Sequence, residues 1–278
     1  MKITKMQGLG NDYIYIHCTE GQITDPAALA RRISDRHFGV GSDGLVLILP
    51  CDGNEADFRM RMFNADGSES EMCGNATRCI AKYIYDRGLS NKKEIRLMTG
   101  AGIKILKLSV KDGITQSVRV DMGEPILEAS DIPVKAPEST VIGMPVEACG
   151  KTFRMTCVSM GNPHAVIFVD DADRFDVHGI GAALECHPLF PRKTNVEFVT
   201  VKDREHLRMR VWERGSGETL ACGTGACATL VAAVLNGLCE RKAVLELNGG
   251  PLTVEWDPVT NHIYQEGPAA FVFDAEYE

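Results

Sequence analysis

The chain has 278 residues, of which 44% are hydrophobic, so it can form one large domain or two medium-sized domains with a substantial core. Its net charge of −8 comes from interspersed acidic and basic residues, and no block of Lys and Arg suggests a phosphate track, so we expect no nucleic-acid partner. The N-terminal segment has no apolar core of a signal peptide, and no apolar run reaches about 18 residues, so we expect a cytoplasmic protein without a membrane span.

Short β-branched runs predict strands throughout the chain. In the first half they cover residues 13–17, 44–49, 58–63, 94–98, 103–110 and 117–122. In the second half they cover residues 154–160, 165–169, 196–201, 207–213, 243–247 and 252–256. Helical spacing is clear over residues 76–86, before Gly88, and over residues 226–235, before Gly237. Together these elements predict an α+β fold.

The ten cysteines are scattered, and no Cys-x-x-Cys pair occurs. In a chain that can build its own core, this pattern predicts reduced thiols rather than a disulfide framework. The spacings do not fit zinc sites, so we expect no metal. Isolated cysteines usually behave as small buried hydrophobic residues. We expect this of Cys18, Cys51, Cys149, Cys157, Cys186 and Cys239, and also of Cys79 and Cys227 on the predicted helices.

Two landmarks of the first half recur in the second half, in the same order. Gly10-Asn11 and Gly161-Asn162 each open a β-rich run. Cys73-Gly74 and Cys222-Gly223 each follow a polar turn and precede a predicted helix. The repetition predicts two homologous domains, residues 1–120 and 121–262, which meet close to a Pro-rich connection over residues 124–145.

A cysteine followed by glycine at a helix start has a specific chemistry. The unpaired N–H groups and the positive end of the helix dipole stabilise a thiolate, so we expect its pKa to fall from about 8.5 into the range ~3.5–7.5. Gly74 and Gly223 let a ligand approach the backbone, and the same N–H groups can hold a carboxylate. Two such thiols facing each other across a cleft would suit inversion at a carbon acid, with one removing a proton and the other delivering one. We expect no cofactor, since neither a pyridoxal-phosphate lysine motif nor a P-loop is present.

Longer segments around these landmarks resemble a known family. They are Lys5-Met-Gln-Gly-Leu-Gly-Asn-Asp12, Met72-Cys-Gly-Asn-Ala-Thr-Arg78, Val158-Ser-Met-Gly-Asn-Pro-His164 and Glu213-Arg-Gly-Ser-Gly-Glu-Thr-Leu-Ala-Cys-Gly-Thr-Gly225. In this order and spacing they are similar to the signatures of the diaminopimelate epimerases. The resemblance extends over essentially the whole chain.

The resemblance implies two pseudo-symmetric α+β domains, each a β-sheet or barrel wrapped around a central helix, with the active site in the cleft between them. It also implies that residues 263–278 return to the first domain and that the protein is a homodimer. Members of the family interconvert LL- and meso-2,6-diaminopimelate on the route to lysine and, in bacteria, peptidoglycan. They use neither metal nor cofactor, so the partner we expect is this small-molecule substrate.

The resemblance also implies roles for single residues. Cys73 and Cys222 would be the acid/base pair, with His164 and Glu213 tuning or orienting the thiols. The reacting carboxylate would be held by Gly74, Asn75, Gly223 and Thr224. Further substrate contacts would come from Asn11, Asn64, Asn162, Asn195, Glu213 and Arg214. Taken singly, the asparagines after glycine suit turns, His164 suits a structural histidine, and Glu213 with Arg214 suits a solvated pair.

Other functions remain open at this stage. A proline racemase or hydroxyproline epimerase would share the fold and the two thiols but bind only one carboxylate. For such an enzyme the set Asn64, Asn162, Asn195 and Arg214 would be unnecessary. A redox-regulated binding protein would use Cys73 and Cys222 as a disulfide. A relative of the fold that works without thiols is disfavoured, because both cysteines are present.

Overall fold

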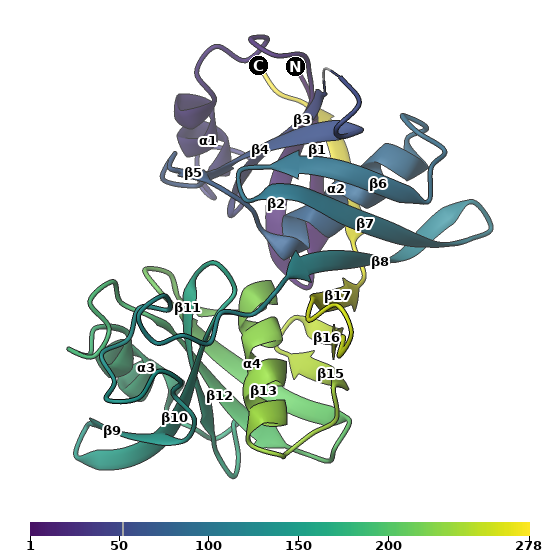
Figure 1. Ribbon diagram of the computed structural model, residues 1–278. Helices are drawn as coiled ribbons and strands as arrows, with labels where there is room; N and C mark the ends of the chain where they lie inside the picture. Colours follow the sequence, from purple (N-terminus) through teal and green to yellow (C-terminus); the bar gives the residue numbers. More distant parts are fainter. Residues whose placement is uncertain (52) are drawn as a thin grey trace. The chain divides into compact units, whose positions relative to one another are not determined.

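The computed structural model describes residues 1–51 and 53–278. Its internal contacts divide the chain into two compact units. Unit 1 consists of Met1–Asp121 together with Glu266–Glu278, and unit 2 consists of Met122–Gln265. Each unit combines strands with helices, which confirms the α+β class (Figure 1).

Unit 1 is a mixed sheet with two helices. Its strands are β1 (Lys2–Gly8), β2 (Asn11–His17), β3 (Gly44–Pro50), β4 (Phe58–Asn64), β5 (Glu69–Ser70), β6 (Glu94–Thr99), β7 (Gly102–Lys111), β8 (Ile114–Gly123) and β18 (Ala270–Glu276). Its helices are α1 (Pro26–Ser34) and α2 (Gly74–Asp86). The strands are arranged in the order β18-β1-β2-β3-β4-β6-β7-β8, with β5 as a short hairpin partner of β4. The pairs β2–β3 and β4–β6 are parallel, and the other pairs are antiparallel.

Unit 2 repeats this plan. Its strands are β9 (Met144–Ala148), β10 (Lys151–Ser159), β11 (Pro163–Phe168), β12 (Asn195–Val201), β13 (His206–Glu213), β14 (Gly217–Thr219), β15 (Lys242–Leu247), β16 (Gly250–Trp256) and β17 (Ile263–Gly267). Its helices are α3 (Val177–Glu185) and α4 (Gly223–Leu235). The order β9-β10-β11-β12-β13-β15-β16 has parallel pairs β11–β12 and β13–β15, as in unit 1. This matching order of pairings confirms the pseudo-symmetric architecture.

The helices α2 and α4 are the most enclosed elements of their units. Helix α2 packs against β1, β2 and β7, and α4 packs against β10, β11, β12 and β16 (Figure 1). Most residues of both helices are buried. The glycines expected to end them, Gly88 and Gly237, have φ of 71° and 70°, the left-handed conformation that glycine adopts without strain. Both helix predictions are therefore confirmed, although each helix begins two or three residues earlier, directly after Cys73 or Cys222.

Helices α1 and α3 were not predicted. The Asp25 side chain caps α1 by accepting a hydrogen bond from the Ala28 N–H, and Pro26 occupies the first helical turn. The Asp176 side chain caps α3 by accepting from the Gly179 N–H. Both caps are recognisable in a sequence. The helices themselves are only about two turns long, too short for their spacing to stand out.

The prediction that isolated cysteines are buried is only partly right. Cys18, Cys157 and Cys239 are buried, as are Cys79 and Cys227 in the helices, but Cys51 is half-buried. For Cys149 and Cys186 the prediction is wrong, because both are exposed. Cys149 lies in the turn between β9 and β10 with φ of 51°, and Cys186 is the C-cap of α3. Turns and helix ends face solvent even when the residue is apolar.

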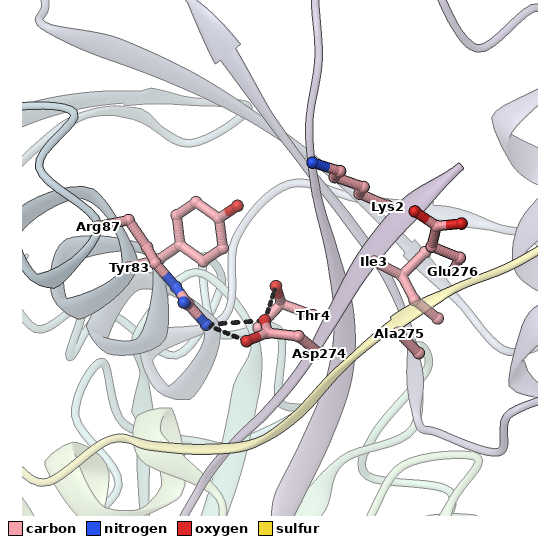
Figure 2. Close-up of a pocket in the computed structure, with 8 residues that line it drawn as sticks. All are labelled: Lys2, Ile3, Thr4, Tyr83, Arg87, Asp274, Ala275 and Glu276. Carbon is pink, nitrogen blue, oxygen red and sulfur yellow. Dashed lines mark hydrogen bonds and ion pairs between the residues drawn. The ribbon is translucent and has the colours of Figure 1, made fainter.

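The C-terminal strand β18 belongs to unit 1, where it pairs with β1. Asp274 anchors it by accepting hydrogen bonds from the Thr4 hydroxyl at 2.7 Å and from the Arg87 guanidinium at 2.6 and 2.7 Å (Figure 2). The Arg87 guanidinium also lies 4.5 Å from the centre of the Phe271 ring. Strand β18 is thereby fixed both to β1 and to the end of α2.

The central placement of α2 predicts a large effect of truncating a side chain on it. Ile84→Ala removes a fully buried side chain. We expect the free energy of unfolding to fall by about 2–5 kcal/mol, because the surrounding sheet cannot fill the space. Ile114→Ala deletes the same atoms from a side chain of unit 1 that is 54% exposed, and should change stability by less than about 0.5 kcal/mol. Urea unfolding followed by circular dichroism measures both, and equal losses would contradict this placement.

Candidate functional site

The first group of candidate residues lies where β2 begins and α2 begins, both in unit 1. Cys73 is the N-cap of α2, in extended backbone conformation, and its carbonyl accepts from the Thr77 N–H at 2.9 Å. The Cys73 thiol donates to Asn11 Oδ1 at 3.4 Å, and Asn75 Nδ2 donates to the same oxygen at 3.3 Å. Asn11 is itself held by Asp43, whose Oδ2 accepts from Asn11 Nδ2 at 2.8 Å. The structure therefore brings Asn11, Cys73 and Asn75 together.

A buried cation lies beneath this helix start. Arg78 is fully buried in the first turns of α2. Its guanidinium donates to Gly74 O at 3.3 Å, to Asn75 Oδ1 at 2.7 Å and to Pro268 O at 3.2 Å. The positive charge adds to the positive end of the helix dipole. The start of α2 thus favours a bound anion such as a carboxylate.

Asn64 lies at the end of β4, where its Nδ2 donates to Ser68 Oγ at 2.9 Å and its backbone N–H donates to Ser68 O. These bonds belong to the turn that leads into β5. The backbone of Asn64 pairs with Gly44, the first residue of β3. Its side chain thus serves the turn in this structure, and a role in binding stays a prediction.

The second group lies at the start of α4 in unit 2. Cys222 is the N-cap of α4, and its Sγ accepts from the Gly225 N–H at 3.3 Å and lies 3.5 Å from Thr224 Oγ1. Glu213, at the end of β13, hydrogen-bonds to this thiol and accepts from the Thr219 hydroxyl. Only 5% of the Cys222 surface is exposed. Cys222 thus caps its own helix, whereas the Cys73 thiol instead bonds to Asn11.

The electrostatics around Cys222 overturn one expectation. Burial raises the pKa of the Cys222 thiol well above its ordinary value, and the carboxylates of Glu213 and Glu197 raise it further, outweighing the bonds from Thr224 and Gly225. The prediction that the helix start lowers this pKa is therefore wrong for Cys222. Burial likewise raises the pKa of Glu213. Cys222 is consequently a thiol near neutral pH.

His164 is fully buried beside this group. Its Nδ1 lies 2.7 Å from Glu197 Oε1, and its Nε2 lies 3.1 Å from Asn162 Oδ1. The sequence analysis missed Glu197. A signal was present, since Glu197 is the one charged residue within the apolar run of β12, where a lone carboxylate needs a partner.

Asn195 and Arg214 form a backbone-linked pair at the edge of the group. Asn195 Nδ2 donates to Pro163 O at 2.8 Å, and its Oδ1 accepts from the Arg214 N–H at 2.9 Å. The amide thus joins the start of β11 to the turn after β13. The exposed Arg214 guanidinium donates to Arg192 O at 3.0 Å. Gly223 follows Cys222, and a Cβ there would lie 2.9 Å from Gln265 Oε1, so the backbone packs closely at this point.

Two structural findings concern other kinds of site. Among residues 1–51 and 53–278, no group of three or more His, Cys, Asp or Glu side chains is placed to hold a metal ion. Within the same residues, no helix has the length and apolar character needed to cross a membrane.

A cavity of about 450 Å³ is lined by residues of β1, α2 and β18 (Figure 2). Its lining, which includes the Arg87–Asp274 pair, contains neither Cys73 nor Cys222.

Comparisons with known proteins show the family to which the chain is similar. A family model described as diaminopimelate epimerase matches residues 3–128 and 156–272. The chain is 59% identical to a diaminopimelate epimerase of Acetivibrio thermocellus, over 100% of this chain and 99% of that protein. It is 54% identical to one of Methanococcus maripaludis, over 100% of both.

Solved structures share the fold at low identity. A hydroxyproline epimerase from Agrobacterium vitis has a TM-score of 0.70 at 16% identity, over 99% of this chain and 91% of that chain. A PhzF-family protein from Bacillus anthracis has a TM-score of 0.69 at 18% identity, over 100% of this chain and 99% of that chain. At such identities the likeness concerns the fold alone.

The raised pKa of Cys222 predicts an unusual pH dependence of alkylation. Only the thiolate reacts, and a cysteine in an unstructured peptide is half-ionised near pH ~8.5. Because the pKa of Cys222 lies higher, its rate with iodoacetamide should still be rising at a pH where the rate of the peptide has levelled off. Peptide mapping by mass spectrometry over a pH series measures the rate at Cys222. A rate that levels off below pH ~8 would show that the thiol assignment is wrong.

Proposed function

This chain belongs to the diaminopimelate epimerase family, and we propose that it interconverts LL- and meso-2,6-diaminopimelate by a two-base mechanism without a cofactor. The observation that carries the proposal is the pair of Cys-Gly helix starts, Cys73-Gly74 and Cys222-Gly223, at equivalent positions of two repeated units. Relatives that bear this name match the whole chain at 54–59% identity. The same proposal includes a cytoplasmic homodimer that acts in lysine and peptidoglycan-precursor synthesis.

We assign Cys222, beside two carboxylates, as the proton donor. We assign Cys73 as the base, which acts once its thiol, the donor to Asn11 Oδ1 in this structure, has lost its proton. The guanidinium of Arg78 lies in the same first turns of α2. The Cys73 thiolate removes the α-proton from one face of the substrate carbon and becomes a thiol. The Cys222 thiol delivers its proton to the opposite face and becomes a thiolate, so each turnover exchanges the protonation states of the two sulfurs. The reverse reaction starts from that exchanged state.

The carbanion formed between these steps needs strong stabilisation. Its charge spreads onto the α-carboxylate, which we place against the N–H groups at the starts of α2 and α4, after Gly74 and Gly223. One preorganised donor of this kind contributes about 2.7–4 kcal/mol to the transition state. Asn11 and Asn75 add amide groups close to Cys73.

The rest of the substrate needs recognition at its second amino-acid end. Arg214 is exposed, and its planar guanidinium can bind a carboxylate through two hydrogen bonds. We assign Arg214 and the asparagines Asn64, Asn162 and Asn195 to this distal end. A cyclic imino acid has no such group, so this set favours diaminopimelate over proline.

The substrate itself is tested by incubating the reduced protein with LL-diaminopimelate, L-proline and trans-4-hydroxy-L-proline in separate reactions. We expect meso-diaminopimelate to form and the two imino acids to stay unchanged, as followed by chiral chromatography. Inversion of proline without formation of meso-diaminopimelate would establish the racemase alternative instead.

The two-base mechanism predicts that each cysteine is essential. Cys73→Ala and Cys222→Ala should each lower kcat by about 10²–10⁴-fold, because a positioned acid or base usually contributes this factor. Cys149→Ala, at an exposed turn, is the matched control and should keep full activity. Circular dichroism checks that all three variants fold. Turnover at the wild-type rate in either catalytic variant would refute the mechanism.

A further inference from the structure

The Glu197 side chain is fully buried on β12 and lies against the first turn of α4. A Cβ built on Gly225 would lie only 2.6 Å from Glu197 Oε1, so glycine at this position leaves the room that the carboxylate occupies. A buried carboxylate costs several kcal/mol unless it is paired. Packing alone does not explain why a carboxylate is buried against the helix turn that follows Cys222.

One oxygen of Glu197 has a partner and the other has none. Oε1 lies 2.7 Å from His164 Nδ1, in a pair that is buried on both sides. Oε2 has no hydrogen-bond partner within the part of the chain that the structure describes. The negative charge of Glu197 is therefore only partly satisfied by its own contacts, and the remainder acts on the neighbouring groups.

The contacts of the His164 ring fix its orientation. Nδ1 faces a carboxylate oxygen and Nε2 faces Asn162 Oδ1 at 3.1 Å. Glu197 and Asn162 thus hold the ring at its two nitrogens, and Glu197 fixes which edge of the ring is directed toward Asn162.

Several groups act on the Cys222 sulfur. The Gly225 N–H and the Thr224 hydroxyl contact it from α4, while the carboxylates of Glu213 on β13 and Glu197 on β12 raise the pKa of the thiol. Glu197 lies close to this sulfur, since a Cβ on Gly225 would lie 2.6 Å from Glu197 Oε1 and 3.2 Å from Cys222 Sγ. The carboxylates oppose a further negative charge on sulfur, and removing the Glu197 charge takes away one of them.

We propose that Glu197 is a positioning residue, which fixes His164 against Asn162 and keeps Cys222 protonated in the resting enzyme. It acts through these two residues and does not itself contact substrate. The inference rests on the proposed function for its catalytic meaning, since a protonated Cys222 decides which substrate stereoisomer the resting enzyme accepts. Its physical content, the state of His164 and Cys222, can be measured without any substrate.

The test compares wild-type protein with Glu197→Gln, which keeps the shape of the side chain and removes its charge. We expect Cys222 to react with iodoacetamide at least about tenfold faster at pH 7.5, because a carboxylate a few Å away changes the thiol–thiolate equilibrium by that much or more. We also expect the ring ¹⁵N signals of His164 to shift, because Nδ1 loses its carboxylate partner. In the epimerase assay with LL-diaminopimelate, where Cys222 is the proton donor, the alkaline limb of the kcat/KM profile should move to lower pH, with KM changed less than kcat.

Matched variants separate charge from packing. Glu185→Gln makes the same change at a buried carboxylate of unit 2 that bonds to Trp212, Lys193 and Gly215, and should leave the alkylation of Cys222 unchanged. Glu197→Asp keeps the charge and should keep an alkylation rate of Cys222 close to that of wild type. If Glu197→Gln does not fold, Glu197→Asp against wild type still tests the role, because alkylation at least about tenfold faster despite a retained carboxylate would contradict it.

Wild-type alkylation rates and ¹⁵N signals in Glu197→Gln would overturn the inference. The proposed function fails separately. If the wild-type protein does not epimerise diaminopimelate but Glu197→Gln changes the state of Cys222 and His164, then Glu197 positions these residues for another reaction.

Discussion

The site depends on one structural constraint, which is that each candidate sulfur is the N-cap of a buried central helix. Because α2 and α4 are enclosed by their sheets, their first turns are fixed in place, and the N–H groups there point toward the cysteine and its surroundings. Both glycines that follow the cysteines are buried, and at Gly223 the absence of a side chain leaves room for Gln265. The strands contribute the remaining side chains from their ends, with Asn11 from β2, and Glu213 from β13. Two contacts stabilise helix α2 in its unit. Arg87, at its end, bonds to Asp274 of β18, and the buried Arg78 bonds to Pro268 O.

The two units are alike in fold but opposite in local charge. Beneath the start of α2 lies the guanidinium of Arg78, whereas the start of α4 is flanked by the carboxylates of Glu197 and Glu213. A symmetric scaffold thus offers two different environments to chemically identical thiols. The proposed two-base reaction needs one sulfur as base and the other as acid, and our assignment of these roles draws on this inequality.

The sequence contains most of the fold, because helix period, terminating glycines and β-branched runs are local signals. The repeat of Gly-Asn and Cys-Gly further predicts that both helices begin at a cysteine. Local signals do not predict which side chains surround each cysteine in the folded chain. The pKa of Cys222 is raised by burial and by the carboxylates of Glu213 on β13 and Glu197 on β12, which the fold brings to the start of α4. Likewise, the exposure of Cys149 and Cys186 follows from a turn and a helix end rather than from residue type. The pairing of His164 with Glu197 depends on the parallel register of β11 and β12.

The most direct test of the account follows solvent deuterium during the first few per cent of reaction. LL-diaminopimelate is incubated with the reduced protein in deuterated water, and product and unreacted substrate are separated and analysed by mass spectrometry. Two bases on opposite faces predict that the meso product carries deuterium at the inverted α-carbon, while recovered LL substrate carries almost none. A single base that removes and returns the proton would label recovered substrate as fast as product. Deuterium in the recovered substrate at the rate of product formation would therefore contradict the assignment of Cys73 and Cys222 as an acid/base pair.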